Sequence, residues 1–144
     1  MIDLICYTAL LALLLYMTRI TQGARVLLKY GDTVLPGRVL KCAPGLMNRV
    51  GLLNTPALAP GDGLYLPGVK SIHTKGMHYP IDILFLDDSK RILAFQKSVA
   101  AGQRRVKGPK GVSATLELGA GTIDQFLPGL ELYKRIEVHD ERPH

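Results

Sequence analysis

Glycine and proline recur about every ten residues along most of this chain, and they restrict it to short structural elements. The 144 residues include 15 glycines and 9 prolines, and beyond Gly23 these separate short apolar runs. Short apolar runs bounded by turn residues are typical of β-strands. The sequence therefore predicts one compact, mostly β domain (α+β), a barrel-like or rolled sheet with one or two short helices.

The expected elements follow the apolar runs. Strands are expected at 25–29, 34–42, 63–66, 81–86, 92–96, 114–118 and 130–138, the second of them interrupted at Pro36 and Gly37. The sequence DDSKR at 87–91 predicts a hairpin turn, and short helices are expected at 43–53 and 119–127. The β-rich domain is expected to occupy residues 23–138, followed by a polar, frayed tail at 139–144.

Residues 1–22 form a separate, strongly apolar segment. From Leu4 to Met17 every residue is apolar or small except Thr8. A cleaved signal peptide would begin with a basic residue, and a buried core helix would show a polar face. We favour a third alternative, an N-terminal hydrophobic helix that anchors the chain in a membrane. Basic residues follow this segment, so the positive-inside rule predicts a domain on the cytoplasmic side rather than an exported one.

Composition narrows the class of partner. Hydrophobic residues make up 47% of the chain, which excludes global disorder. The formal net charge of +6 favours an anionic partner, such as acidic lipid. Aromatic residues make up only 6% and tryptophan is absent, which argues against a surface that stacks nucleic-acid bases. The two cysteines form neither a disulfide framework nor a metal motif.

An ionisable residue stands in the most apolar of the expected strands. In Ile81–Leu86 every residue except Asp82 is apolar. Alternation places Asp82 and Leu84 on one face of the strand and Ile83 and Phe85 on the other. A buried carboxylate must be paired or hydrogen-bonded. We predict that Asp82 fixes the neighbouring backbone, bound either by Arg49 or by main-chain N–H groups; a functional carboxylate is the alternative.

Three blocks of sequence, in this order, resemble the family called domain of unknown function 192. The first is RVGLL (49–53) followed by GDGL (61–64), and the last is LELGAG (116–121). The central and most specific block is IHTKGM (72–77), followed by PID (80–82) and FLD (85–87). The resemblance implies a small, mostly β domain that often follows a signal or anchor segment, and it implies no established reaction.

The resemblance also marks residues of interest and two departures. The family motifs single out a possible site at Arg49, His73, Thr74, Gly76, Met77, Asp82 and Glu117. The late Gly-Asp pair of the family is replaced by PGLELYKR (128–135). A loop that is often rich in proline and tryptophan is replaced by the basic stretch 103–110. If these elements serve a partner, the partner of this protein differs from that of its relatives.

A catalytic alternative rests on four of the polar residues. A small hydrolase or a metal-dependent enzyme could use the side chains of His73, His78, Asp82 and Glu117. The spacing of these residues matches no zinc motif. Glu117 lies between two leucines and is expected to be exposed or paired with Arg49 or a histidine. The carboxylates of Asp82 and Glu117 would have to meet to form an acid/base pair. We predict no metal ligand set and no cofactor.

The densest basic cluster comprises Arg104, Arg105, Lys107 and Lys110. A solvated loop is the simplest interpretation, and an anionic lipid surface beside the anchor is the best functional one. Nucleic acid is disfavoured because no aromatic residue or recognised motif accompanies the cluster. The sequence thus predicts a membrane-tethered binding or accessory domain, with anionic lipid or an envelope protein as partner, as in a secretion or pilus system.

Overall fold

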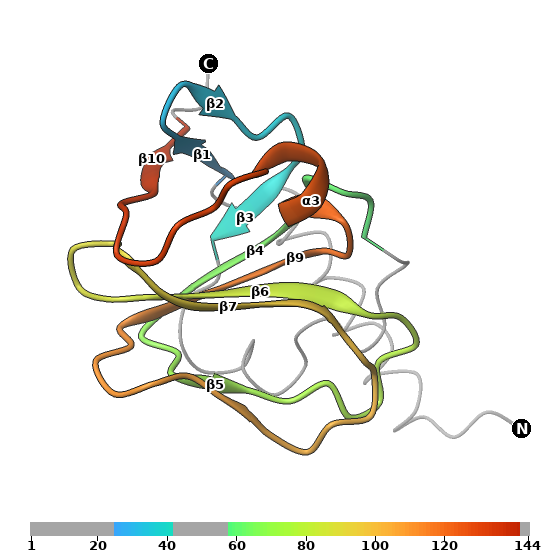
Figure 1. Ribbon diagram of the computed structural model, residues 1–144. Helices are drawn as coiled ribbons and strands as arrows, with labels where there is room; N and C mark the ends of the chain where they lie inside the picture. The colour runs from blue at the N-terminus through green and yellow to red at the C-terminus, as the bar shows by residue number, and fades with distance from the viewer. Residues whose placement is uncertain (1–24, 42–57, 142–144) are drawn as a thin grey trace, which may run out of the picture.

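The computed structural model describes residues 25–41 and 58–141. In chain order, their elements are β1 (Arg25–Tyr30), β2 (Thr33–Val34), β3 (Val39–Lys41), β4 (Gly63–Pro67), β5 (Ser71–Ile72), β6 (Ile81–Leu86), β7 (Ile92–Val99), β8 (Val106–Lys107), β9 (Ala114–Gly119), α3 (Thr122–Phe126) and β10 (Glu137–Asp140). The protein is therefore mostly β, with one short helix among these residues (Figure 1).

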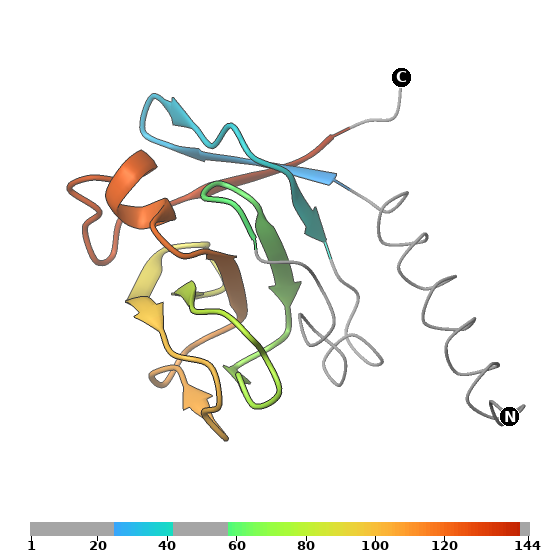
Figure 2. The same ribbon diagram turned by 90° about the vertical axis from the view of Figure 1, so that its right-hand side faces the viewer.

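The strands form one large curled sheet and one small one. The large sheet has the order β10-β1-β3-β4-β9-β6-β7, and β2, which lies off this order, pairs with β1. All of its pairs are antiparallel except β3 with β4. Figures 1 and 2 show that it curls into a half-barrel. The short strands β5 and β8 pair with each other and form a separate two-stranded ribbon.

Each face of the large sheet carries its own hydrophobic core. Ile83 and Phe85 of β6 pack with Ile72 of β5 and Val106 of β8, so the two-stranded ribbon covers one face. Leu84 and Leu86 pack on the other face with Ile123 of α3. All six residues of β6 are buried, because both faces of this strand are covered. The alternation predicted for β6 is confirmed.

Local turn chemistry explains the hairpin between β6 and β7. Asp87 Oδ1 accepts hydrogen bonds from the backbone N–H groups of Ser89, at 2.9 Å, and Arg91, at 2.8 Å. Lys90 adopts a left-handed φ of 62°, which closes the turn. An aspartate that binds the backbone two residues further on is a recurrent turn device. The hairpin predicted from DDSKR is confirmed.

The last expected strand is placed wrongly by the sequence. The strand predicted at 130–138 begins only at Glu137 and ends at Asp140. The preceding stretch instead binds the start of β7, where Tyr133 N–H donates to Ile92 O and Ile92 N–H donates to Lys134 O. His139 and Asp140 therefore belong to β10 rather than to the frayed tail expected from residue 139.

The remaining expected elements fall partly inside and partly outside the described residues. The helix expected at 119–127 is present as the shorter α3, and β8 lies inside a stretch expected to be a loop. The N-terminal hydrophobic helix, the helix expected at 43–53 and Arg49 lie outside the described residues. Within the described parts of the chain, no helix has the length and hydrophobicity needed to cross a membrane.

Candidate functional site

Asp82 holds two distant pieces of backbone together. Its Oδ1 accepts a hydrogen bond from Ser98 N–H, and its Oδ2 accepts one from Ile123 N–H, both at 2.9 Å. Ser98 has a left-handed φ of 48° and lies where the pairing of β6 with β7 slips by a residue, as in a β-bulge. Asp82 is 1% exposed and thus joins this irregularity to the first turn of α3.

Thr74 is the centre of the HTKGM turn. It is fully buried, its hydroxyl donates to Ala100 O at 2.8 Å, and the same oxygen accepts from Gln103 N–H at 2.9 Å. Gly76 adopts a left-handed φ of 86°, which favours glycine, and Met77 is buried in the core. The motif therefore ties the segment before β6 to the segment after β7.

Replacing Thr74 with valine tests this role. Valine keeps the shape but removes the hydroxyl, so one backbone donor and one acceptor lose their partner. We expect the free energy of unfolding to fall by about 1–3 kcal/mol. Urea unfolding followed by circular dichroism measures it, and Thr74→Ser, which keeps the hydroxyl, serves as the matched control. A valine variant as stable as the parent would contradict the assignment.

Glu117 is buried on the opposite face of the sheet from Asp82. It is 6% exposed, and its cross-strand neighbours are Leu64 on β4 and Ile83 on β6. Its Oε2 has no hydrogen-bond partner among the described residues. Burial raises the pKa of Glu117 from an ordinary 4.5 to about 7. Of the alternatives expected for Glu117, exposure is wrong, and no histidine among the described residues pairs with it. Arg49, the third alternative, lies outside these residues.

The four side chains of the catalytic alternative do not form one site. Asp82 lies opposite Leu118 and Glu117 lies opposite Ile83, so the two carboxylates point to different faces of the sheet. His73 and His78 are both exposed. In the described ranges no three His, Cys, Asp or Glu side chains come together to hold a metal ion. The structure therefore does not bring the four predicted catalytic residues together.

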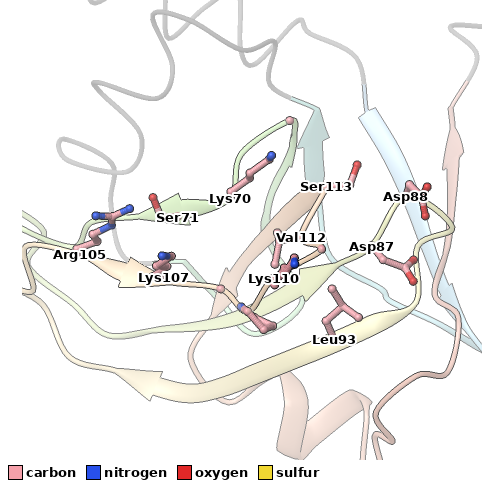
Figure 3. A pocket seen from close by; sticks show the side chains of 14 residues that line it. Lys70, Ser71, Asp87, Asp88, Leu93, Arg105, Lys107, Lys110, Val112 and Ser113 are labelled. Carbon is pink, nitrogen blue, oxygen red and sulfur yellow. The ribbon is translucent and has the colours of Figure 1, made fainter.

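A basic groove lies beside the β5–β8 ribbon. It encloses about 1020 Å³ and is lined by Lys70, Ser71, Arg105, Lys107 and Lys110 together with the loop that leads into β9 (Figure 3). Asp87 and Asp88, from the β6–β7 hairpin, line the other end. The groove thus contains cations from two segments of the chain that are distant in sequence.

The walls of this groove are held by backbone hydrogen bonds. Gly108 N–H donates to Lys70 O at 3.2 Å, and Gly68 N–H donates to Ser113 O at 2.8 Å. The backbone of Gly108 packs directly against the core, since a Cβ there would come within 2.7 Å of Phe85 Cδ1. The turn that presents Lys110 is therefore fixed by packing before any ligand arrives.

The cations of the groove take part in none of the ion pairs that the described residues form. In residues 25–41 and 58–141 the ion pairs involve Arg25, Lys41, Lys97, Lys134 and His139. None of these residues lines the groove. A smaller hollow of about 290 Å³ near α3 differs, because its Lys97 is bound to Asp124 at 2.6 Å. Converging cations without partners are the arrangement expected of an anion site.

The groove contains part of the basic cluster that stands out in the sequence. Of the cluster Arg104, Arg105, Lys107 and Lys110, the last three line the groove and Arg104 does not. Lys70 and Ser71 were missed, because only the pairing of β5 with β8 brings them to the cluster. The one signal in the sequence was the isolated Lys70 after a Pro-Gly turn.

Comparison with known proteins assigns this chain to a family. A half-barrel sheet with a short covering ribbon defines a small β domain, and the family model of DUF192, Uncharacterized ACR, matches residues 41–135. The chain belongs to this family, as the three sequence blocks had indicated. No curated protein matches the chain.

Two solved structures are similar in fold. A crystal structure of a candidate transcription regulator from Sinorhizobium meliloti 1021 has a TM-score of 0.67 at 21% identity, and covers 80% of this chain and 92% of its own. A protein of unknown function from Novosphingobium aromaticivorans has a TM-score of 0.63 at 16% identity, and covers 78% and 83%. Similarity at these identities shows a shared fold and carries no function.

Proposed function

We propose that this protein is a membrane-tethered binding domain whose basic groove rests on an anionic lipid surface. The observation that carries the proposal is a set of four cations that line one groove and form no ion pair within residues 25–41 and 58–141, namely Lys70, Arg105, Lys107 and Lys110. Each basic residue near an anionic membrane contributes about 1 kcal/mol of attraction. The apolar N-terminal segment supplies the tether, and the domain lies on the cytoplasmic side.

Such a domain serves as an accessory part of an envelope assembly, such as a secretion or pilus system. A hydrolase or metal enzyme is the other candidate, but the separation of Asp82 from Glu117 across the sheet gives it no support. A nucleic-acid partner is less suited to the groove, because Asp87 and Asp88 at one end would repel a continuing phosphate backbone.

Vesicle binding by the full chain tests the proposal. We expect the parent to bind vesicles that contain phosphatidylglycerol more tightly than neutral phosphatidylcholine vesicles, with a preference that falls as salt rises. Changing Lys70, Arg105, Lys107 and Lys110 to glutamine should reduce this preference at least about tenfold. Parent and variant share the N-terminal segment, so its contribution cancels in the comparison.

A matched variant controls for net charge. It removes the same number of cations at positions that do not line the groove, namely Arg25, Lys29, Lys41 and Lys134. We expect this control to keep most of the preference for anionic vesicles. Equal losses in both variants would show that only overall charge matters and would overturn the groove assignment. Stronger binding to duplex DNA than to anionic vesicles would overturn the lipid role.

A further inference from the structure

We propose that the groove binds a compact ligand carrying two phosphate groups, such as a bisphosphate or a lipid headgroup with two linked phosphates. This inference rests on the proposed function only in treating the groove as an anion site. It depends on how the cations are arranged: they form two groups along the groove, and a pair of carboxylates closes the far end (Figure 3).

The first group lies on the outer face of the β5–β8 ribbon. Ser71 is the direct cross-strand partner of Lys107, and the next pair, Ile72 with Val106, is buried in the core. Since side chains alternate along a strand, Ser71 and Lys107 point away from the core. Arg105, two residues before Lys107, lies on the same side. One hydroxyl and two cations therefore gather at one place and can bind one phosphate.

The second group comprises Lys70 and Lys110. The backbone of Lys70 accepts a hydrogen bond from Gly108, at the start of the turn that carries Lys110. Gly111 closes this turn with a left-handed φ of 97°. Figure 3 shows both lysines between the first group and the acidic end of the groove. A second phosphate bound here would lie next to the first.

The acidic end limits the length of the ligand. Asp87 and Asp88 line the groove beyond the lysines, and Asp87 is oriented by its bonds to the backbone of the hairpin. A third phosphate at this end would meet like charge. The two groups of cations and the two carboxylates beyond them therefore match two adjacent phosphates better than a long polyanion.

Soluble probes measure this preference in the detergent-solubilised full chain. We expect glycerol 1,3-bisphosphate to bind at least about tenfold more tightly than glycerol 1-phosphate, because its second phosphate binds at a high effective concentration. The Arg105→Gln, Lys107→Gln double variant removes the first group, and the Lys70→Gln, Lys110→Gln double variant removes the second. In each double variant only one phosphate site remains, so the two probes should bind with nearly equal affinity.

The outcomes separate this inference from the proposed function. The Lys41→Gln, Lys134→Gln variant, altered outside the groove, should keep the preference. Equal binding of the two probes to the parent would overturn the two-phosphate inference, even if anionic vesicles still bind. A preference for cardiolipin over phosphatidylglycerol vesicles at equal charge would support the inference with lipid as the source. A preference for the soluble bisphosphate without vesicle binding would support the two-phosphate inference with a soluble molecule as the ligand, and it would overturn the lipid role.

Discussion

Replacing Asp82 with alanine is expected to lower the free energy of unfolding by about 2–5 kcal/mol. The substitution removes both acceptors at once, so the N–H groups of Ser98 and Ile123 lose their partner. Ile123 is buried, so its N–H group has no access to water. Asp82→Asn keeps one acceptor oxygen but turns an amide donor toward the other N–H, and it should cost about 1–3 kcal/mol.

Urea unfolding of the full chain in mild detergent, followed by far-ultraviolet circular dichroism, measures both changes, since the sequence has no tryptophan to report by fluorescence. Asp124→Asn is the matched control, because Asp124 forms an exposed ion pair with Lys97. Its effect should stay within about 1 kcal/mol. An Asp82→Ala variant that unfolds at the same urea concentration as the parent would show that the carboxylate does not hold the bulge to α3.

The two partners of Asp82 illustrate what the sequence can and cannot predict. The need for a partner follows from a carboxylate within an apolar run, and local alternation predicted the face correctly. The partners themselves lie 16 and 41 residues away, at a bulge and at the start of a helix. The helix is expected from the sequence, but its contact with Asp82 is not, and the bulge depends on how β7 pairs with β6.

The groove shows the same division between local and distant information. The cations at 105–110 are close in sequence, so they stand out there as one basic cluster. Lys70 joins them only through a ribbon with two residues in each strand, which no periodicity reveals. The strand misplaced at 130–138 fails for a related reason, because Tyr133 and Lys134 bind the start of β7 rather than continuing into β10. In both cases long-range pairing, and not local propensity, decides where the strands form.

Stability should fall as pH rises through neutrality, and Glu117 should be the cause. Burial raises the pKa of Glu117 to about 7, above the ordinary 4.5 that applies to the unfolded chain. A group whose pKa is raised by folding binds its proton more tightly in the folded state. The stabilisation is therefore present in full below pH 4.5 and is lost as pH rises through the folded pKa of about 7. The difference of 2.5 between these pKa values corresponds to about 3 kcal/mol.

Glu117→Gln should remove this dependence while keeping the size of the side chain. The cross-strand neighbours of Glu117, Leu64 and Ile83, carry no charge, so no partner there holds the ionised form. We expect parent and variant to be similarly stable at pH 5, and the variant to be more stable by about 1–3 kcal/mol at pH 8. Urea unfolding across this range of pH measures the difference in stability between parent and variant. For Glu131→Gln, an exposed control, the free energy of unfolding should change with pH as it does in the parent. If Glu117→Gln also shows the pH dependence of the parent, then the carboxylate is not titrating in a buried site, and the interior around β9 must supply a partner for its charge.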